Sequence, residues 1–410
     1  MIDIKDKKDC CGCEACVQRC PVNCISLHED EEGFLYPRVD KDACIGCGLC
    51  EKVCPVINQY TPIEPLSVYA AINPNEEIRL QSSSGGIFTM LAEQIIDKGG
   101  VVFGVGFNEQ WEIVHKFTET KEGLSEFRGS KYVQSRTGDS FRQAEAFLKQ
   151  GREVLYSGTP CQISGLKHFL RKDYPNLLTV DFICHGVPSP SVFRTYLKEA
   201  IDYTARKGRK NTVSLSSIRS VPESDAPVED LEIRRIAFRD KTLGWKKYSF
   251  ALVLAKATAD GEEIQFCSRR SLREDPYLKG FMSNLYLRPS CHDCRVKGLS
   301  SASDITMGDY WRVSEVVPDV DDEKGVSAVI VNTEKGRDVL QNIEVQLFPS
   351  TLSDVEERNA ALSHSTPLSA KRTTFFKASG RGVTERVEHL TRLTLFQRVR
   401  RKAKHLFARI

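Results

Sequence analysis

The chain has 410 residues, of which 40% are hydrophobic and 28% charged, and its formal net charge is +3. This length suffices for two or three domains with a hydrophobic core, and so small a charge does not indicate nucleic-acid binding. The first residues are charged and lack the apolar segment of a signal peptide, and no stretch approaches the roughly 18 apolar residues of a membrane-spanning helix. We therefore expect a cytoplasmic protein with no nucleic-acid partner.

Cysteine is the most informative residue type in this chain. There are 15 cysteines, and ten of them lie within residues 10–54. Disulfide bonds are disfavoured in the cytoplasm, so metal binding or redox chemistry is the better explanation for so many thiols.

The first sixty residues contain the pattern C-x2-C-x2-C-x3-C-P twice, and in this pattern the fourth cysteine of each run binds the cluster of the other run. We therefore expect a ferredoxin-like module with two [4Fe–4S] clusters. A turn at Glu32 and Gly33 predicts a hairpin of two short strands between the runs. The expected ligand sets are Cys10, Cys13, Cys16 and Cys54 for one cluster, and Cys44, Cys47, Cys50 and Cys20 for the other.

A pair of zinc sites is the alternative for this module, but zinc sites favour two C-x2-C pairs with a longer gap. Cys11 and Cys24 fall outside the pattern, and we interpret them as small buried residues. Residues 1–60 carry 7 Lys and Arg against 11 Asp and Glu. An acidic surface of this kind suits a basic redox partner, although a solvated charged surface explains it equally well.

The middle of the chain has the pattern of an α/β layer. Strands are expected at 67–72, 101–107, 152–157 and 177–184, with helices beginning near Ile87 and Ile163. The loop Ser82–Gly86 precedes the first of these helices, so it is either an anion site or an ordinary helix cap. It matches neither the Walker loop nor the dinucleotide fingerprint.

Four more cysteines come from three separate segments. Cys161 and Cys184 follow the ends of predicted strands, where open α/β sheets bind ligands, and Cys291 and Cys294 form a C-x2-C pair. These four thiols predict a third [4Fe–4S] cluster. The alternatives are a zinc site that includes His185 or His292, or a catalytic or simply buried Cys161. Cys267 has no partner in spacing and is interpreted as structural.

Seven stretches in order resemble the coenzyme F420 hydrogenase/dehydrogenase beta-subunit family, which includes iron–sulfur flavoproteins. They cover, with the cysteine runs, roughly residues 1–330: SSSGGIFTMLAEQII (82–96), RGSKYVQS (128–135), SGTPCQISGLK (157–167), DFICHGVPSPSVF (181–193), FRDKTLGW (238–245), FMSNLYLRPSCHDC (281–294) and SDITMGDYW (303–311).

The resemblance implies a bound FAD and a third cluster on Cys161, Cys184, Cys291 and Cys294. For each polar flavin candidate, an ordinary cap or turn is the alternative. There are two interpretations of Asp304, Asp309 and Trp311: they lie near the site, or they belong to a structural turn. The resemblance leaves open whether the protein uses coenzyme F420 itself. The implied flavin contacts are Ser84, Gly85, Gly86, Ser130, Lys131, Tyr132, Thr159 and Gln162.

The predicted fold class is α+β. A dicluster ferredoxin module (1–60) precedes an α/β flavin-binding-type domain, which comprises the family's N-terminal region (66–150) and its C-terminal region with the third cluster (151–330). An α/β extension (331–380) and a basic amphipathic helix (381–410) follow.

We expect an oxidoreductase that passes electrons from a ferredoxin-type donor or a partner subunit through the clusters to a flavin and a two-electron acceptor. The alternatives are a non-catalytic relay subunit, and a scaffold with structural clusters in cell-surface polysaccharide synthesis, a process with which the family is associated. The basic tail either lies on the inner face of the membrane or packs on the body. An oligomer is compatible with the sequence.

Overall fold

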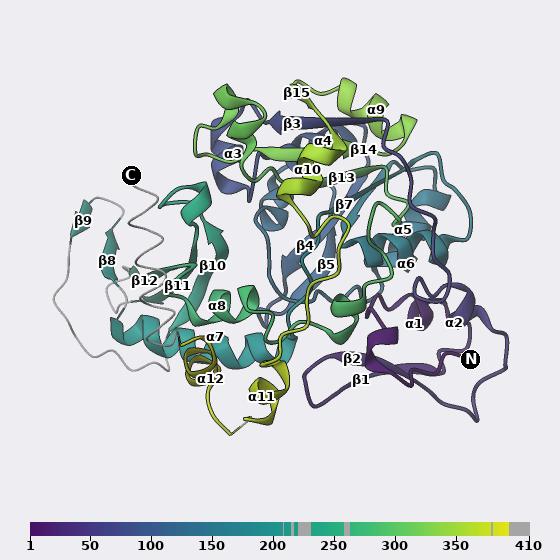
Figure 1. Cartoon of the computed structure of the whole chain (residues 1–410), viewed down its shortest axis with the longest axis horizontal. Coiled ribbons are helices and arrows are strands. Elements are labelled where there is room, and N and C mark those ends of the chain that lie inside the picture. Colours follow the sequence, from purple (N-terminus) through teal and green to yellow (C-terminus); the bar gives the residue numbers. More distant parts are fainter. Residues whose placement is uncertain (208, 215–216, 220–230, 258–262, 379, 393–410) are drawn as a thin grey trace.

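The computed structural model of the chain describes residues 1–207, 209–214, 217–219, 231–257, 263–378 and 380–392 (Figure 1). Its centre is an eight-stranded mixed sheet with the order β15-β3-β14-β13-β7-β6-β4-β5. The strands are β3 (Ser67–Ile72), β4 (Val101–Phe107), β5 (Ile113–Thr118), β6 (Val154–Gly158), β7 (Leu177–Phe182), β13 (Ile305–Asp309), β14 (Ser327–Val331) and β15 (Gln346–Ser350).

Five strands of this sheet run in the same direction. Strands β4, β6, β7 and β13 pair in parallel, and β14 is antiparallel to both β13 and β3. The carboxyl ends of β3, β4, β6, β7 and β13 therefore meet at one edge, which is where sheets of this kind bind ligands.

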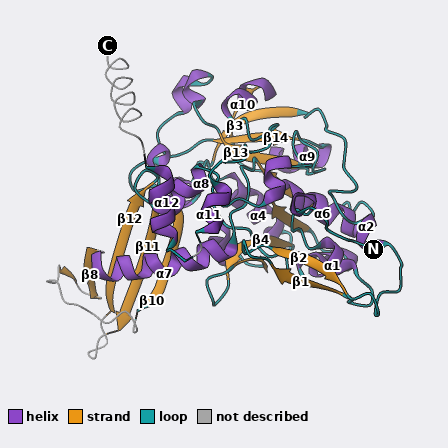
Figure 2. Ribbon diagram, turned by 60° about the horizontal axis from the view of Figure 1, so that its bottom comes forward, coloured by secondary structure: helices purple, strands orange, loops and turns teal. Residues whose placement is uncertain are grey.

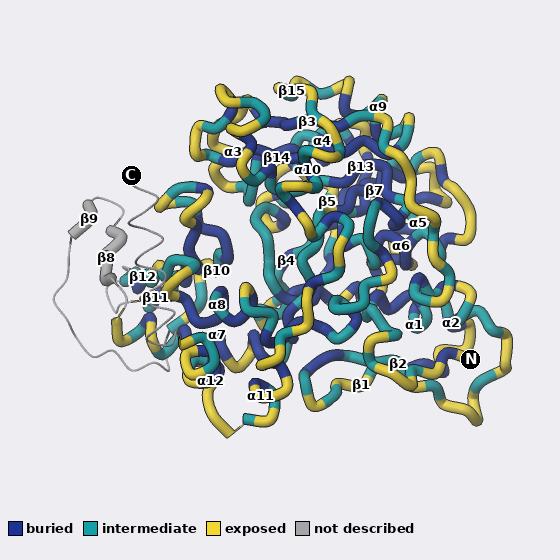
Figure 3. Tube along the Cα trace, in the orientation of Figure 1, coloured by how far each residue is buried: buried dark blue, intermediate teal, exposed yellow. Residues whose placement is uncertain are grey.

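Helices cover both faces of the sheet, because successive strand residues point to opposite sides. Leu155 of β6 packs with α4 (Ile87–Asp97) and α9 (Glu334–Gln341). Its neighbours Val154 and Tyr156 pack on the other face with α5 (Ser140–Lys149) and α6 (Pro160–Leu170). Figure 3 shows that this layered region is the most deeply buried part of the molecule.

A second, antiparallel sheet lies beside the first (Figure 2). It was not expected from the sequence. The core between this sheet and its helices contains Tyr196, Phe250 and Leu278. The strands are β8 (Arg209–Ser214), β9 (Ser217–Arg219), β10 (Glu232–Asp240), β11 (Ser249–Ala257) and β12 (Glu263–Ser271), and the helices are α7 (Pro190–Lys207), α8 (Pro276–Met282), α11 (Arg372–Lys377) and α12 (Val383–Thr391).

The N-terminal module has little core of its own. Its hydrophobic cluster consists mainly of cysteines with Ile2 and Ile25. The predicted hairpin is confirmed, since β1 and β2 pair antiparallel around Gly33. The elements of the module are η1 (Lys7–Asp9), α1 (Ala15–Arg19), β1 (Ile25–Glu29), β2 (Leu35–Val39) and α2 (Leu49–Lys52).

The remaining short elements connect these parts. They are α3 (Glu76–Gln81), η2 (Glu122–Phe127), η4 (Trp245–Lys247), η5 (Pro289–Asp293), η6 (Val313–Glu315), η7 (Pro318–Val320) and α10 (Leu352–Arg358).

Most of the predicted elements are found, with corrected ends. The strands at 67–72 and 101–107 and the helix from Ile87 are confirmed. Helix α6 begins at Pro160 rather than Ile163, because Thr159 caps it and proline suits the first helical position. Cys161 therefore lies in the first turn of the helix, and not in a loop as predicted.

The tail is described only in part. Val383 and Val387 of α12 are buried against the body, and the rest of the predicted basic helix, 393–410, lies outside the described residues. Among the helices that the structure describes, none is both long and apolar enough to cross a membrane.

Candidate functional site

The first cysteine run, Cys10–Cys20, is docked on helices α5 and α6 of the body. The Thr137 hydroxyl donates to the Cys13 carbonyl at 3.0 Å, and the Phe141 amide donates to Gln18 Oε1 at 3.0 Å. Gly165 allows α6 to approach closely, because a Cβ there would lie 3.0 Å from Cys13 Sγ. The first run is thus part of the interface between module and body.

The thiols expected for the first cluster are neighbours across the two runs. Burial raises the pKa of the Cys16 thiol, and the nearby Cys10 and Cys54 thiols raise it further. Cys10 also acts on Cys54 in the same way. Cys13 lies near Cys16 and Cys54 as well. The four residues of the first predicted set are therefore close together, and Cys50 of the second predicted set lies near Cys16 and Cys54 as well.

The second run, Cys44–Cys54, lies at the surface. Cys20 and Cys50 are buried and Cys44 is partly buried in the same small cluster, whereas Cys47 is exposed. The Ile2 amide donates to Cys50 Sγ at 3.2 Å, the type of contact that tunes thiolate ligands. Ile45, next to these ligands, is 65% exposed.

A cavity gathers the other four predicted thiols. Its empty space, including the part open to solvent, is about 560 Å³, and the lining includes Cys161, Cys184, Cys291 and Cys294. Cys161 comes from the first turn of α6, Cys184 follows β7, and Cys291 lies in η5. Residues more than a hundred positions apart thus meet at the carboxyl edge of the sheet.

Polar contacts hold the walls of this cavity. The Val187 amide donates to Cys291 Sγ at 3.4 Å, and the Cys294 amide donates to Ser365 Oγ at 2.9 Å. Lys297 Nζ donates to the Cys184 carbonyl at 2.5 Å. The 363–366 segment, which no sequence signal indicated, therefore supports the C-x2-C pair.

Burial disfavours the charged form of the thiols in this cavity. Burial raises the pKa of Cys184 to about 12, and burial together with Cys184 raises the pKa of Cys291. Such thiols are protonated at neutral pH, and they would serve as thiolate ligands only where a bound cation compensates their charge. In the described part of the chain, no three Cys, His or acidic side chains converge on a single-ion site.

Cys11 also lines this cavity. Its thiol contacts the thiols of Cys13 and Cys161, and the Cys13 thiol raises its pKa. From the sequence, Cys11 was predicted only to be a small buried residue. Its position between the first run and the cavity comes from the docking of the module, which spacing alone does not indicate.

The Ser/Gly loop is bound tightly to its protein neighbours. Ser84 Oγ donates to the Val326 carbonyl at 2.7 Å, and the Gly85 amide donates to Ser327 Oγ at 2.9 Å. A Cβ at Gly85 would lie 2.4 Å from the Ala71 carbonyl oxygen. Close packing therefore explains Gly85 without a ligand. Gly86 has a φ of +82° and begins α4.

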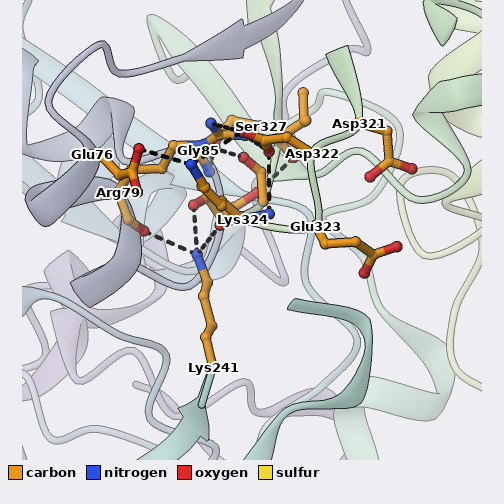
Figure 4. Close-up of polar contacts among 12 residues, drawn as sticks. Glu76, Arg79, Gly85, Lys241, Asp321, Asp322, Glu323, Lys324 and Ser327 are labelled. Atoms are coloured by element: carbon orange, nitrogen blue, oxygen red, sulfur yellow. Dashed lines mark hydrogen bonds and ion pairs between the residues drawn. The ribbon is translucent and has the colours of Figure 1, made fainter. Parts of the chain in front are cut away.

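Lys241 connects this loop to helix α3 and to the loop before β14 (Figure 4). Its ammonium donates to the carbonyls of Arg79, Ser84 and Lys324 at 3.0, 2.9 and 2.7 Å. Arg79 in turn forms an ion pair with Asp322 at 2.6 Å. The carboxyl edge near β3 and β14 is thus rigidly organised.

Two predicted flavin contacts are used in a helix cap. The Thr159 amide donates to Gln162 Oε1 at 3.0 Å, and Gln162 Nε2 donates to Ser135 Oγ at 3.0 Å. Ser135 also contacts His115 Nδ1 at 3.3 Å. Burial lowers the pKa of His115 to about 4. Thr159 and Gln162 therefore form an ordinary helix cap, which is one of the two interpretations drawn from the sequence.

The 128–132 segment lies beside the Ser/Gly loop. Ser130 Oγ contacts Ser83 Oγ at 2.8 Å. Lys131 Nζ donates to the carbonyls of Arg128 and Gly129 at 3.3 and 3.2 Å, and burial lowers its pKa to about 7. Two local carbonyls therefore hold the Lys131 amine, and burial disfavours its charged form.

A buried arginine with spare donors lies close to Tyr132. Arg239 pairs with Asp309 and its guanidinium lies 4.5 Å from the Tyr248 ring centre and 5.3 Å from that of Trp311. Its Nε and Nη2 atoms have no hydrogen-bond partner among the residues that the structure describes. Arg239 was not predicted to be a site residue, although it lies in the FRDKTLGW stretch.

The acidic residues of the SDITMGDYW stretch separate in the structure. Asp309 ends β13 at the carboxyl edge and accepts from Trp245 Nε1 at 3.2 Å. Asp304 precedes the same strand, at the opposite edge, and accepts from the Thr179 amide at 2.8 Å. Of these residues, Asp309 lies at the carboxyl edge, with Trp311 two positions further on and stacked under Arg239, whereas Asp304 lies at the opposite edge.

Three family models match this chain in succession. Residues 9–58 match a 4Fe–4S dicluster domain. Residues 68–140 match the N-terminal part, and residues 151–350 the C-terminal part, of the coenzyme F420 hydrogenase/dehydrogenase beta subunit. No curated protein matches significantly.

A chain in a solved structure of the F420-reducing [NiFe] hydrogenase complex from Methanosarcina barkeri, a xenon derivative, is 16% identical. The alignment covers 73% of this chain and 90% of that chain, with a TM-score of 0.43. On the family models, this chain belongs to the coenzyme F420 hydrogenase/dehydrogenase beta-subunit family of oxidoreductases, and a 4Fe–4S dicluster domain forms its N-terminal part.

Proposed function

We propose that the protein is an iron–sulfur flavoprotein oxidoreductase that accepts electrons one at a time and transfers them in pairs. The exposed second run receives electrons from a ferredoxin-type donor or partner subunit, the first run passes them inward, and the cavity thiols hold a third cluster. A bound FAD supplies the coupling of one-electron to two-electron chemistry. The observation that carries the proposal is the cavity lined by Cys161, Cys184, Cys291 and Cys294 beside the first run.

Helix α6 supports the step from the first run to the cavity. Gly165 packs against the Cys13 sulfur, and Cys161 lines the cavity. These positions are four residues apart on one face of the helix, about 6 Å along its axis. A single turn of helix thus links the two proposed cluster sites.

Aromatic rings support the step from the cavity to the flavin. His185, beside Cys184, contacts the Phe281 ring at 5.1 Å, and Phe281 stacks on Tyr132 at 4.6 Å. Beyond Tyr132 lie Arg239 Nε and Nη2, which have no hydrogen-bond partner in the described part of the chain. Such donors suit the oxygens of a flavin or its phosphates.

We place the FAD at this part of the carboxyl edge. Lys131 would offset its negative charge, and Thr159 and Gln162 would shape the wall, since the Thr159 hydroxyl donates to Gln162 Oε1 and Gln162 Nε2 donates to Ser135 Oγ. The other proposed contacts are Ser84, Gly85, Gly86, Ser130 and Tyr132.

The test is anaerobic purification followed by iron, sulfide and flavin analysis. We expect about twelve iron atoms per chain, four for each cluster, and one FAD. Absence of flavin would overturn the flavoprotein proposal. Flavin that is reduced by ferredoxin but reacts neither with coenzyme F420 nor with other two-electron acceptors would instead identify a relay subunit. The comparisons give no support to a link with polysaccharide synthesis.

A further inference from the structure

The side chain of Arg288 is buried between the first cysteine run and the cavity, and the whole residue has 0% exposure. It lies three positions before Cys291 in the chain. Its Nε donates to the Cys10 carbonyl at 2.7 Å, and its Nη2 donates to the Leu35 carbonyl at 2.9 Å and lies 3.5 Å from Cys10 Sγ. A guanidinium from the body therefore reaches a proposed cluster ligand of the module.

The positive charge of Arg288 is not balanced by a carboxylate in the described part of the chain. Its other hydrogen-bond acceptor is the neutral Gln134 Oε1 at 2.9 Å, and the Tyr36 ring lies 4.3 Å from its guanidinium. Glu14 is affected by this charge, but its carboxylate accepts from the Gly138 amide instead. A buried, unpaired cation is costly unless an anion compensates it. Thiolates bound to a cluster are such an anion.

The first run is shaped to admit this side chain. A Cβ at Gly12 would lie 2.8 Å from Arg288 Nη1 and 2.3 Å from Gln134 Nε2. Gly46 occupies the equivalent position of the second run, and a Cβ there would meet no atom within 4 Å. Of the two runs, the first therefore packs its glycine against a buried arginine, whereas the second has open space at the equivalent position.

We propose that Arg288 is a positioning residue that raises the reduction potential of the cluster on the first run above that of the second. A [4Fe–4S] cluster gains one negative charge on reduction. A fixed positive charge and an N–H···S contact stabilise this reduced state most strongly in a dry interior. Electrons that arrive at the exposed run would then move inward. This inference rests on the proposed function, since it requires a cluster at each run.

The test is a redox titration monitored by electron paramagnetic resonance, on the full chain with its clusters. Arg288→Met, which keeps the length of the side chain and removes its charge, is expected to lower the potential of one reduction step and leave the other steps unchanged. Arg288→Lys should retain most of the wild-type potential. Iron content is measured in every sample.

Arg372→Met is the matched control. Arg372 is also buried and also fixes the module to the body, through Glu32 and the Leu287 carbonyl. It contacts no cysteine thiol in the part of the chain that the structure describes, so its loss should lower stability without moving any potential. A shift of equal size in Arg372→Met would show that docking alone sets the potential, and would overturn the role of Arg288.

A second variant decides the question if Arg288→Met fails to retain iron. Gln134→Glu keeps Arg288 in place and adds a negative charge to the partner of Nη1, so one potential should fall. Unchanged potentials in an iron-replete variant would overturn the inference. These potentials do not depend on whether a flavin binds or an acceptor is reduced, so failure of the proposed function would be recognised separately.

Discussion

The two cysteine runs have the same spacing and opposite surroundings. At the position after the first cysteine, Cys11 lines the interior cavity, whereas Ile45 is 65% exposed. At the next position, Gly12 packs against Arg288 and Gln134, whereas Gly46 meets no neighbour. The spacing of the cysteines therefore determines which cluster each run can bind. The contacts with the body determine the surroundings, and so the role, of that cluster. The module therefore has an inner end at the first run and an outer end at the second run, although the two runs have the same cysteine spacing.

The largest expected effect concerns the cavity thiols beside the first run, which is the inner of the two runs. Cys291→Ser should remove about four of about twelve iron atoms, because it deletes one ligand of the proposed third cluster. Iron and sulfide analysis measures this loss. Cys267→Ser is the control, since Cys267 lies on β12 outside the cavity lining. An unchanged iron content in Cys291→Ser would contradict a third cluster beside the first run.

A pair of glycine substitutions compares the two runs directly. Gly46 has a φ of +66° and open space around it, so Gly46→Ala should cost about 1–2 kcal/mol from backbone strain alone. Gly12→Ala adds a collision with Gln134 and Arg288, for a total of roughly 2–5 kcal/mol. Anaerobic thermal unfolding of both proteins measures the difference. Equal losses would mean that the first run is not held as tightly as the structure describes.

Acid should lower the stability of the folded protein near the first run, because it protonates the buried His115. Its Nε2 contacts the Ser157 carbonyl at 3.2 Å, and its Nδ1 contacts Ser135, which adjoins Gln134. Burial lowers its pKa to about 4, below the usual value of about 6.5. The unfolded chain therefore binds more protons between these values, so stability is complete above pH 6.5 and falls toward pH 4.

The expected loss over this range is up to roughly 3 kcal/mol. Denaturant titrations at several pH values measure it, and His115→Gln should remove this part of the pH dependence. Equal slopes for wild type and His115→Gln would exclude His115 as the source. Cluster loss in acid affects both proteins alike, so the comparison isolates the imidazole.

The smallest effect tests the outer run as a docking surface. Ile45→Ala should weaken interaction with a reduced ferredoxin-type donor by about 1 kcal/mol, or roughly fivefold in kcat/KM. Stability should change by less than about 0.5 kcal/mol at so exposed a position. Leu368→Ala is the control, because Leu368 is equally exposed, at 66%, and lies on the body. A similar kinetic loss in both variants would remove Ile45 as a specific contact.

The sequence predicted what depends on local spacing and periodicity. The hairpin of the module, β3, β4 and α4 follow from alternation, turn residues and helical period, and the structure confirms them. The start of α6 was missed, since proline at a first helical turn resembles a loop signal. The antiparallel sheet was also missed. Its strands β10, β11 and β12 pair in chain order, whereas the pairing of β12 with β8 joins segments far apart in the sequence.

The parts of the site that the sequence did not indicate arise from contacts between distant segments. Arg288, Arg239 and Cys11 acquire their surroundings only when the module docks and the two sheets meet. In contrast, Cys161 and Cys184 could be brought together in advance, because both follow parallel strands that end at one edge. The ligand assignments and the flavin contacts stay predictions.

Rapid mixing of reduced ferredoxin with oxidised protein, followed by freezing and spectroscopy, tests the direction of electron transfer most directly. The account predicts that the dicluster signals appear before reduced flavin. It also predicts that Cys47→Ser, which removes a ligand of the outer cluster, retains the flavin and the remaining iron but reduces that flavin far more slowly. Flavin reduction at an unchanged rate in Cys47→Ser would contradict the proposal that electrons arrive through the exposed run.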